Sequence, residues 1–144
     1  MVFPVAGPVF DLVGRSNSHG LMWAWLRSDL DLASAQGARA ELTGLLDGGE
    51  PPDFVLVYVG ADRFVDLRGL RVLVEVAVSM RDSGGELVLV APPHSLRTIV
   101  QLTGVGAMLP MVATPWHANA LLKSRGARPV TRTAGPTTAE RDRG

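Results

Sequence analysis

The chain of 144 residues is 47% apolar and 19% charged with a formal net charge of zero, which predicts one globular domain with a hydrophobic core. No run approaches the ~18 apolar residues of a membrane span and no basic-then-apolar secretory leader is present, so we expect a cytoplasmic protein. The lack of cysteine excludes disulfides and cysteine-based zinc sites, and the mildly acidic composition before residue 125 argues against nucleic acid as a partner.

The first part of the chain predicts a β-hairpin followed by a helix. Apolar residues dominate 9–13 and 21–27, which predict two strands, and the polar, glycine-containing link at 14–20 suits a hairpin. A helical pattern follows and ends at Asp47 and the two glycines after it. The apolar face of this helix contains Ala38, Leu42, Leu45 and Leu46.

The central stretch, residues 53–80, predicts a buried strand that leads into an amphipathic helix. The β-branched and aromatic run at 54–59 is typical of a strand buried on both faces. Asp66 predicts the N-cap of the helix, because its side chain can accept hydrogen bonds from the free amides of a first turn. The expected core stripe consists of Leu70, Leu73, Val74, Ala77 and Val78. This phase would place Val72 and Val76 on the outward side of the helix.

The last apolar segments predict a further α/β unit. A glycine turn is followed by a buried strand at 86–91. The next helix ends at Gly104, and its apolar residues are Leu96, Ile99 and Val100. Residues 108–113 predict a short final strand, and 116–122 a final helix.

We therefore expect one α/β domain over residues 1–123 and a disordered tail over 124–144. The tail has too few apolar residues to offset the entropy lost on ordering, and 125–144 should be removable without loss of the fold.

Alternation along the strands gives the expected sheet two apolar faces. Trp23 and Trp25 point to one face, whereas Met22, Ala24 and Leu26 point to the other. Right-handed crossovers place the helices on one side, so the second face needs a cover. Self-association, a protein partner or the terminal segments of the chain could each supply it.

Four short motifs stand in the order and spacing of a known family: 30–35 (LDLASA), 64–70 (FVDLRGL), 84–90 (GGELVLV) and 102–105 (LTGV). Together they cover roughly residues 9–122 and resemble the STAS domain, the fold shared by bacterial anti-sigma factor antagonists. The resemblance implies an α/β fold with a mixed four- to five-stranded sheet and helices mainly on one face.

The second helix start departs from the family pattern. In antagonists of this kind the second serine of an Asp-Ser-Ser-Gly turn is phosphorylated by the anti-sigma kinase, which adds about −1.5 to −2 charge and abolishes binding. Leu67 and Arg68 occupy the two serine positions, so the family's site falls at Arg68 and no phosphorylation is expected there. Arg68 is either a surface cation neutralised by Asp62 or Asp66, or a recognition residue that reaches an acidic partner.

The resemblance implies a non-catalytic interaction module that binds an anti-sigma factor, expected to be of the serine-kinase type, without the usual phosphorylation switch. The expected partner-binding residues are Asp31, Ser34, Asp62, Asp66, Leu67, Arg68, Arg71, Val72 and Glu75. Two alternatives remain open: a structural or regulatory subunit of a transporter or signalling assembly, and a small-molecule or nucleotide-binding sensor. A homodimer is a further option.

No pattern predicts a catalytic, metal or cofactor site. His19, His94 and His117 are scattered and are interpreted as surface or capping residues rather than metal ligands. The glycine-rich phosphate loop of nucleotide hydrolases is absent, and no nucleophile–base pair is visible. The single lysine, Lys123, lies too late in the chain for a response-regulator receiver.

Overall fold

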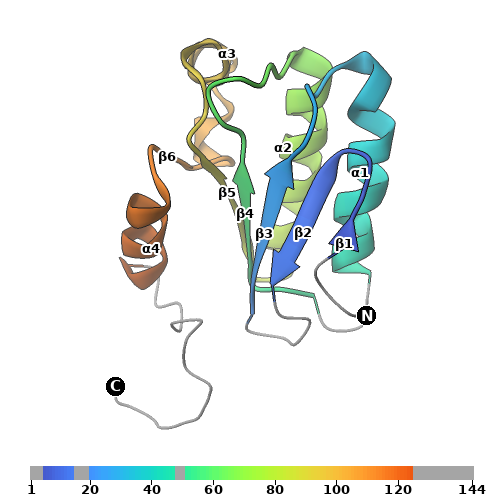
Figure 1. Ribbon diagram of the computed structural model, residues 1–144. Helices are drawn as coiled ribbons and strands as arrows, with labels where there is room; N and C mark the ends of the chain where they lie inside the picture. The colour runs from blue at the N-terminus through green and yellow to red at the C-terminus, as the bar shows by residue number, and fades with distance from the viewer. Residues whose placement is uncertain (1–4, 15–19, 48–50, 125–144) are drawn as a thin grey trace, which may run out of the picture.

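The computed structural model describes residues 5–14, 20–47 and 51–124, which form one mixed sheet with helices on both of its faces (Figure 1). The elements in chain order are β1 (Val5–Ala6), β2 (Phe10–Gly14), β3 (Leu21–Leu26), α1 (Leu32–Leu46), β4 (Phe54–Tyr58), α2 (Leu67–Asp82), β5 (Glu86–Val90), α3 (His94–Thr103), the short 3₁₀ helix η1 (Val105–Ala107), β6 (Met111–Val112) and α4 (Pro115–Ser124). The predicted α/β fold class is confirmed. The proposed tail and most of the hairpin link lie outside the described residues.

The strands lie in the sheet in the same order as in the sequence, β1 to β6. The pairs β1–β2 and β2–β3 are antiparallel, which confirms the predicted hairpin, and the pairs from β3 to β6 are parallel. Strand β1 was not predicted, because a strand of two residues is too short to show an alternation of apolar and polar residues. Residues between β1 and β2 are fixed to α1, because the carboxylate of Glu41 in α1 accepts hydrogen bonds from the amides of Val9 (3.0 Å) and Phe10 (2.8 Å).

The main hydrophobic core lies between the sheet and helices α1, α2 and α3. Val55 and Val57 of β4, and Val59 just after it, lie in this core. The predicted inner face of α1 is confirmed: Ala38, Leu42 and Leu45 are buried, and Leu46 packs at the border. All five side chains of β5 are buried, as expected for a strand covered on both faces.

The predicted core stripe of α2 is confirmed for Leu70, Leu73 and Ala77, but the predicted outward side of the helix is wrong. Val72 is 1% exposed and Val76 is 3% exposed, whereas Val78, expected in the core, is exposed. The helix packs against α1 on its flank as well as against β5 beneath it, so its buried arc is wider than one stripe and turns toward α1. The buried residues are Gly69, Leu70, Val72, Leu73, Val76, Ala77 and Met80. Val72 therefore cannot belong to an exposed binding surface.

The opposite face of the sheet carries a second, smaller hydrophobic cluster, and helix α4 covers part of it (Figure 1). Ala118 and Leu122 of α4 lie in this cluster with Leu56 of β4 and Val88 of β5. The question of what covers the second apolar face is thus answered in part, because a terminal helix packs on it. No helix in the described part of the chain has the length and apolarity needed to cross a membrane.

Candidate functional site

The first turns of α1 and α2 are joined at the carboxyl ends of β3 and β4, at the top of Figure 1. Residues Leu30 and Val65, just before the two helices, form a parallel bridge. The amide of Leu30 donates to the carbonyl of Phe64 (2.8 Å), and the amide of Asp66 donates to the carbonyl of Leu30 (3.0 Å). Because the backbone fixes both segments, the two helix starts form one continuous surface.

Helix α1 begins with a closed capping box. Oδ1 of Asp31 accepts hydrogen bonds from the amides of Ala33 (3.0 Å) and Ser34 (3.2 Å). The Ser34 hydroxyl in turn accepts from the Asp31 amide (3.0 Å) and donates to the carbonyl of Asp29 (2.7 Å). Asp31 and Ser34 therefore act first as the cap of this helix, and their polar atoms are already engaged.

Helix α2 begins with the predicted cap. Oδ1 of Asp66 accepts hydrogen bonds from the amides of Arg68 (2.9 Å) and Gly69 (3.0 Å), which confirms its assignment as N-cap. Gly69 is buried against Leu30: a Cβ placed there would lie 2.6 Å from Cγ of Leu30 and closer still to its carbonyl oxygen. This close approach presses one side of the first turn against the bridge, while Leu67 is left 62% exposed.

Arg68 has no carboxylate partner among the residues that the structure describes. The Asp66 carboxylate caps the helix through backbone amides instead. Neutralisation of Arg68 by Asp62 or Asp66 is therefore not observed. The guanidinium stands in the first turn of α2, where it opposes the macrodipole, and Asp62 stands exposed in the preceding loop.

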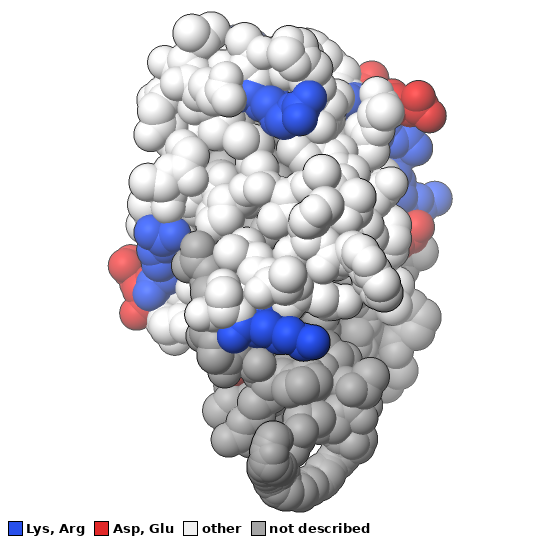
Figure 2. Space-filling model, turned by 90° about the vertical axis from the view of Figure 1, so that its left-hand side faces the viewer, with Lys and Arg blue, Asp and Glu red and all other residues white. Residues whose placement is uncertain are grey.

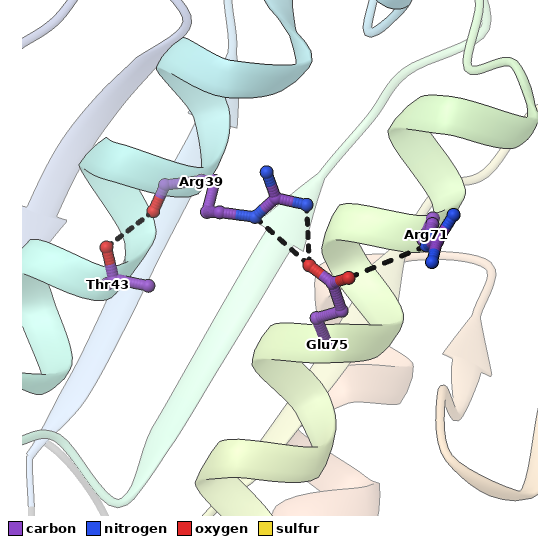
Figure 3. Close-up of polar contacts among 4 residues, drawn as sticks. All are labelled: Arg39, Thr43, Arg71 and Glu75. Carbon is purple, nitrogen blue, oxygen red and sulfur yellow. Dashed lines mark hydrogen bonds and ion pairs between the residues drawn. The ribbon is translucent and has the colours of Figure 1, made fainter.

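Glu75 links the two helices rather than presenting a free charge (Figure 3). Its Oε1 accepts hydrogen bonds from Nε (3.0 Å) and Nη2 (2.7 Å) of Arg39 in α1. Its Oε2 lies 3.6 Å from Nε of Arg71, one turn earlier in α2. An exposed network of this kind contributes at most ~1 kcal/mol, so it mainly fixes the side chains of Arg71 and Glu75 beside the helix starts.

Three large apolar side chains surround the joined helix starts. Leu32 is 66% exposed in the first turn of α1, and Phe64 is 49% exposed just before Val65. Leu67 completes the group. Sequence reasoning missed Leu32 and Phe64, although Leu32 follows its cap directly, as Leu67 does. We call the exposed side chains of Leu32, Asp62, Phe64, Leu67, Arg68 and Arg71 the helix-start surface.

Of the nine predicted binding residues, four lie on this surface: Asp62, Leu67, Arg68 and Arg71. Asp31, Asp66 and Ser34 instead cap the two helices that carry this surface, and Glu75 forms an ion pair with Arg71 at its border. Its combination of apolar, aromatic and arginine side chains is typical of residues that dominate protein interfaces, rather than of a site that performs chemistry.

No group of three or more possible metal ligands occurs within 5–14, 20–47 and 51–124. His94 lies 3.5 Å from the Thr98 hydroxyl, and Nδ1 of His117 lies 2.8 Å from the Thr114 hydroxyl. The remaining histidine, His19, lies outside the described residues.

Comparison with known proteins agrees with this architecture. BtrV of Bordetella bronchiseptica, named as a candidate anti-sigma factor antagonist, is 30% identical over 105 residues, which span 73% of this chain and 89% of BtrV. An anti-sigma factor antagonist from Mycobacterium paratuberculosis has a TM-score of 0.63 at 17% identity, over 83% of this chain and 99% of that one. Unphosphorylated SpoIIAA, an anti-sigma factor antagonist of Bacillus, has a TM-score of 0.61 at 19% identity, over 82% and 97% of the two chains. The STAS domain family matches residues 18–117, and the chain belongs to this family.

Proposed function

We propose that this protein is a non-catalytic interaction module of the anti-sigma factor antagonist type, which binds an anti-sigma factor through the helix-start surface. The observation that carries the proposal is the exposure of Leu67 at the start of α2 beside Arg68, which forms no ion pair with any described residue, in a STAS domain 30% identical to BtrV. A cytoplasmic location follows from this role, because sigma factors act on RNA polymerase there.

Physical chemistry favours a protein partner at this surface. Leu32, Phe64 and Leu67 are about half to two thirds exposed, so a partner that covers them gains that share of the ~1.5–3 kcal/mol for burying a whole apolar side chain. Arg68 would add direction to the binding, because a planar guanidinium can donate two parallel hydrogen bonds to a carboxylate. We therefore expect the partner to present an apolar pocket with an acidic group at its edge.

The same surface is proposed to lack the family's phosphorylation switch. Neither Leu67 nor Arg68 has a hydroxyl group. The Ser34 hydroxyl is engaged in the capping box of α1, and Ser83 lies at the far end of α2 as its C-cap. A serine kinase that binds this surface would therefore find no substrate in the α2 turn, and complex formation would continue in the presence of ATP.

The test is a pull-down from the native cell with the full chain as bait, followed by mass spectrometry. The matched bait is Leu67→Asp, which removes an exposed apolar contact and places an acid where a helix start favours it. We expect the parent bait, and not the variant, to capture an anti-sigma factor. Capture of a transporter or another signalling subunit by both baits would contradict the proposal.

The captured partner then tests the missing switch. The two proteins are incubated with ATP, and the intact mass of this chain and the amount of complex are measured. We expect an unchanged intact mass and an unchanged amount of complex. Phosphate on another residue together with loss of the complex would show that the switch exists at a different position.

A further inference from the structure

An aromatic shelf lies on the sheet face opposite α1 and α2. The strand register places Trp25 of β3 between Asp11 of β2 and Tyr58 of β4, and Trp23 beside Val13. The rings of Trp23 and Trp25 stack with centroids 5.1 Å apart, and those of Trp25 and Tyr58 lie 4.6 Å apart. We define the aromatic shelf as Val13, Trp23, Trp25 and Tyr58.

The shelf is only partly covered. Helix α4 packs mainly against β5 and β6, and its apolar side chains join Leu56 and Val88 in the smaller cluster, against which Trp23 and Tyr58 also pack. Trp25 remains 37% exposed and Val13 is also exposed. Figure 2, which looks onto the α4 side of the molecule, shows a mostly uncharged surface. The ion pair between Asp11 and Arg27 (3.7 Å) borders the shelf beside Trp25.

We infer that residues 125–132 of the same chain dock on this shelf. The chain leaves α4 at Ser124, and Leu122 in the last turn belongs to the cluster that contains Leu21, the first residue of β3. The segment therefore starts on the sheet face that carries both tryptophans, from a helix whose cluster extends to the first residue of their strand. From Leu21 to Trp25 a strand rises ~13 Å, and eight extended residues span ~26 Å, so the reach is sufficient.

The chemistry of the segment fits the shelf. Its sequence, RGARPVTR, contains Arg125, Arg128 and Arg132 and one proline, Pro129. A guanidinium binds an aromatic face through cation–π attraction and stacking, and an extended proline-containing segment packs on aromatic rings with little loss of entropy. Asp11 offers these cations a carboxylate beside Trp25, and its own pairing with Arg27 is long and solvent-exposed.

Covalent linkage makes such weak stacking effective. A short flexible connection gives an effective concentration in the millimolar range, so stacking with a millimolar dissociation constant would keep about half of the molecules docked. Contacts of this kind need no hydrophobic core of their own. The inference therefore concerns the first eight residues of the segment alone and leaves the expected disorder of the remainder unchanged.

The test uses the full chain, which has no cysteine and so accepts a single nitroxide label. Trp116 is 81% exposed on α4 and is replaced in all samples by Trp116→Phe, which leaves Trp23 and Trp25 as the fluorescent reporters. One sample carries the nitroxide at Thr131→Cys and the control carries it at Arg143→Cys. A nitroxide quenches tryptophan emission only at short range. We expect emission of the first sample to fall to about half on labelling, with little change in the control.

Further comparisons separate the alternatives. Arg128→Ser with Arg132→Ser should restore the emission of the sample labelled at 131, whereas Arg141→Ser should not. Equal quenching from positions 131 and 143 would overturn the inference. Quenching that disappears on dilution would overturn it in favour of a second copy of the chain on the shelf, and quenching that survives the double arginine substitution would exclude guanidinium stacking.

Discussion

Helices α1 and α2 start with the same residue types at two positions and differ at the next two. Each has an aspartate cap followed by leucine, Asp31-Leu32 in α1 and Asp66-Leu67 in α2. The third position of the first turn is Ser34 in α1, whose hydroxyl closes a capping box, and Gly69 in α2, which is buried against Leu30.

This difference separates a helix start without a charged side chain in its second position from one that presents a cation there. In α1 the cap residues satisfy one another, and the second position is Ala33, which adds no charge. In α2 the glycine brings the backbone of the first turn close to Leu30 of the bridge. The second position is Arg68, whose guanidinium forms no ion pair within the described part of the chain. Two similar local sequences thus both expose a leucine on the proposed binding surface, but only the α2 start adds a cation to it.

Among substitutions at the two helix starts, Gly69→Ala is expected to change the stability of the protein most. The added Cβ would collide with the side chain and carbonyl oxygen of Leu30, and backbone cannot move away as easily as a flexible side chain. We expect a loss of ~1–3 kcal/mol in the free energy of unfolding, measured by urea denaturation, because overpacking outweighs the higher helix propensity of alanine.

The matched control is Gly44→Ala in α1, where an added Cβ meets nothing within 4 Å. That substitution should stabilise the protein by ~0.5–1 kcal/mol through helix propensity alone. If both variants are stabilised, the joint between the two helix starts is looser than described.

An intermediate effect is expected from Asp66→Ala, which removes the acceptor for the amides of Arg68 and Gly69. Loss of an N-cap typically costs ~1 kcal/mol, again measured by urea denaturation. Asp66→Asn keeps an acceptor oxygen without the charge and should be close to the parent. An asparagine variant as unstable as the alanine variant would mean that the charge of Asp66, and not its capping geometry, stabilises α2.

The smallest effect on stability is expected from Arg68→Glu. The substitution replaces a cation that opposes the macrodipole by an anion that matches it, which should stabilise α2 by ~0.3–1 kcal/mol. Thermal unfolding checks the sign. A clear loss of stability would show that the Arg68 side chain packs on the protein in a way that its lack of an ion pair does not reveal.

The parts of the fold that could be predicted are those fixed by neighbouring residues. The Asp66 cap depends on amides two and three positions away, and the apolar run that follows Glu86 in β5 directly indicates a buried strand. The predicted phase of α2 failed in part because the helix packs against α1 as well as against β5, so residues such as Val72 are buried outside the predicted stripe. A single stripe of apolar residues along a helix indicates one packing face and does not reveal that a second element also packs against the helix.

The candidate site shows the same division. Leu67 and Arg68 stood out in the sequence because they replace expected serines, whereas Leu32 and Phe64 joined them only through the bridge between Leu30 and Val65. Likewise, alternation correctly placed Trp23 and Trp25 on one face of the sheet. It could not predict that α4 would cover β5 and leave those rings partly open, because that depends on tertiary packing.

The most direct test of the proposed interaction is a calorimetric titration of the captured partner with the parent chain, Arg68→Glu and the control Lys123→Glu. Lys123 lies exposed in the last turn of α4, away from the helix starts, so the control makes the same change of charge elsewhere. We predict that Arg68→Glu folds at least as well as the parent yet binds at least about tenfold more weakly, as expected for an interface arginine worth ~1.4 kcal/mol, while the control binds like the parent. Equal affinity of the parent and Arg68→Glu would place the α2 start outside the interface and contradict the proposed mode of binding.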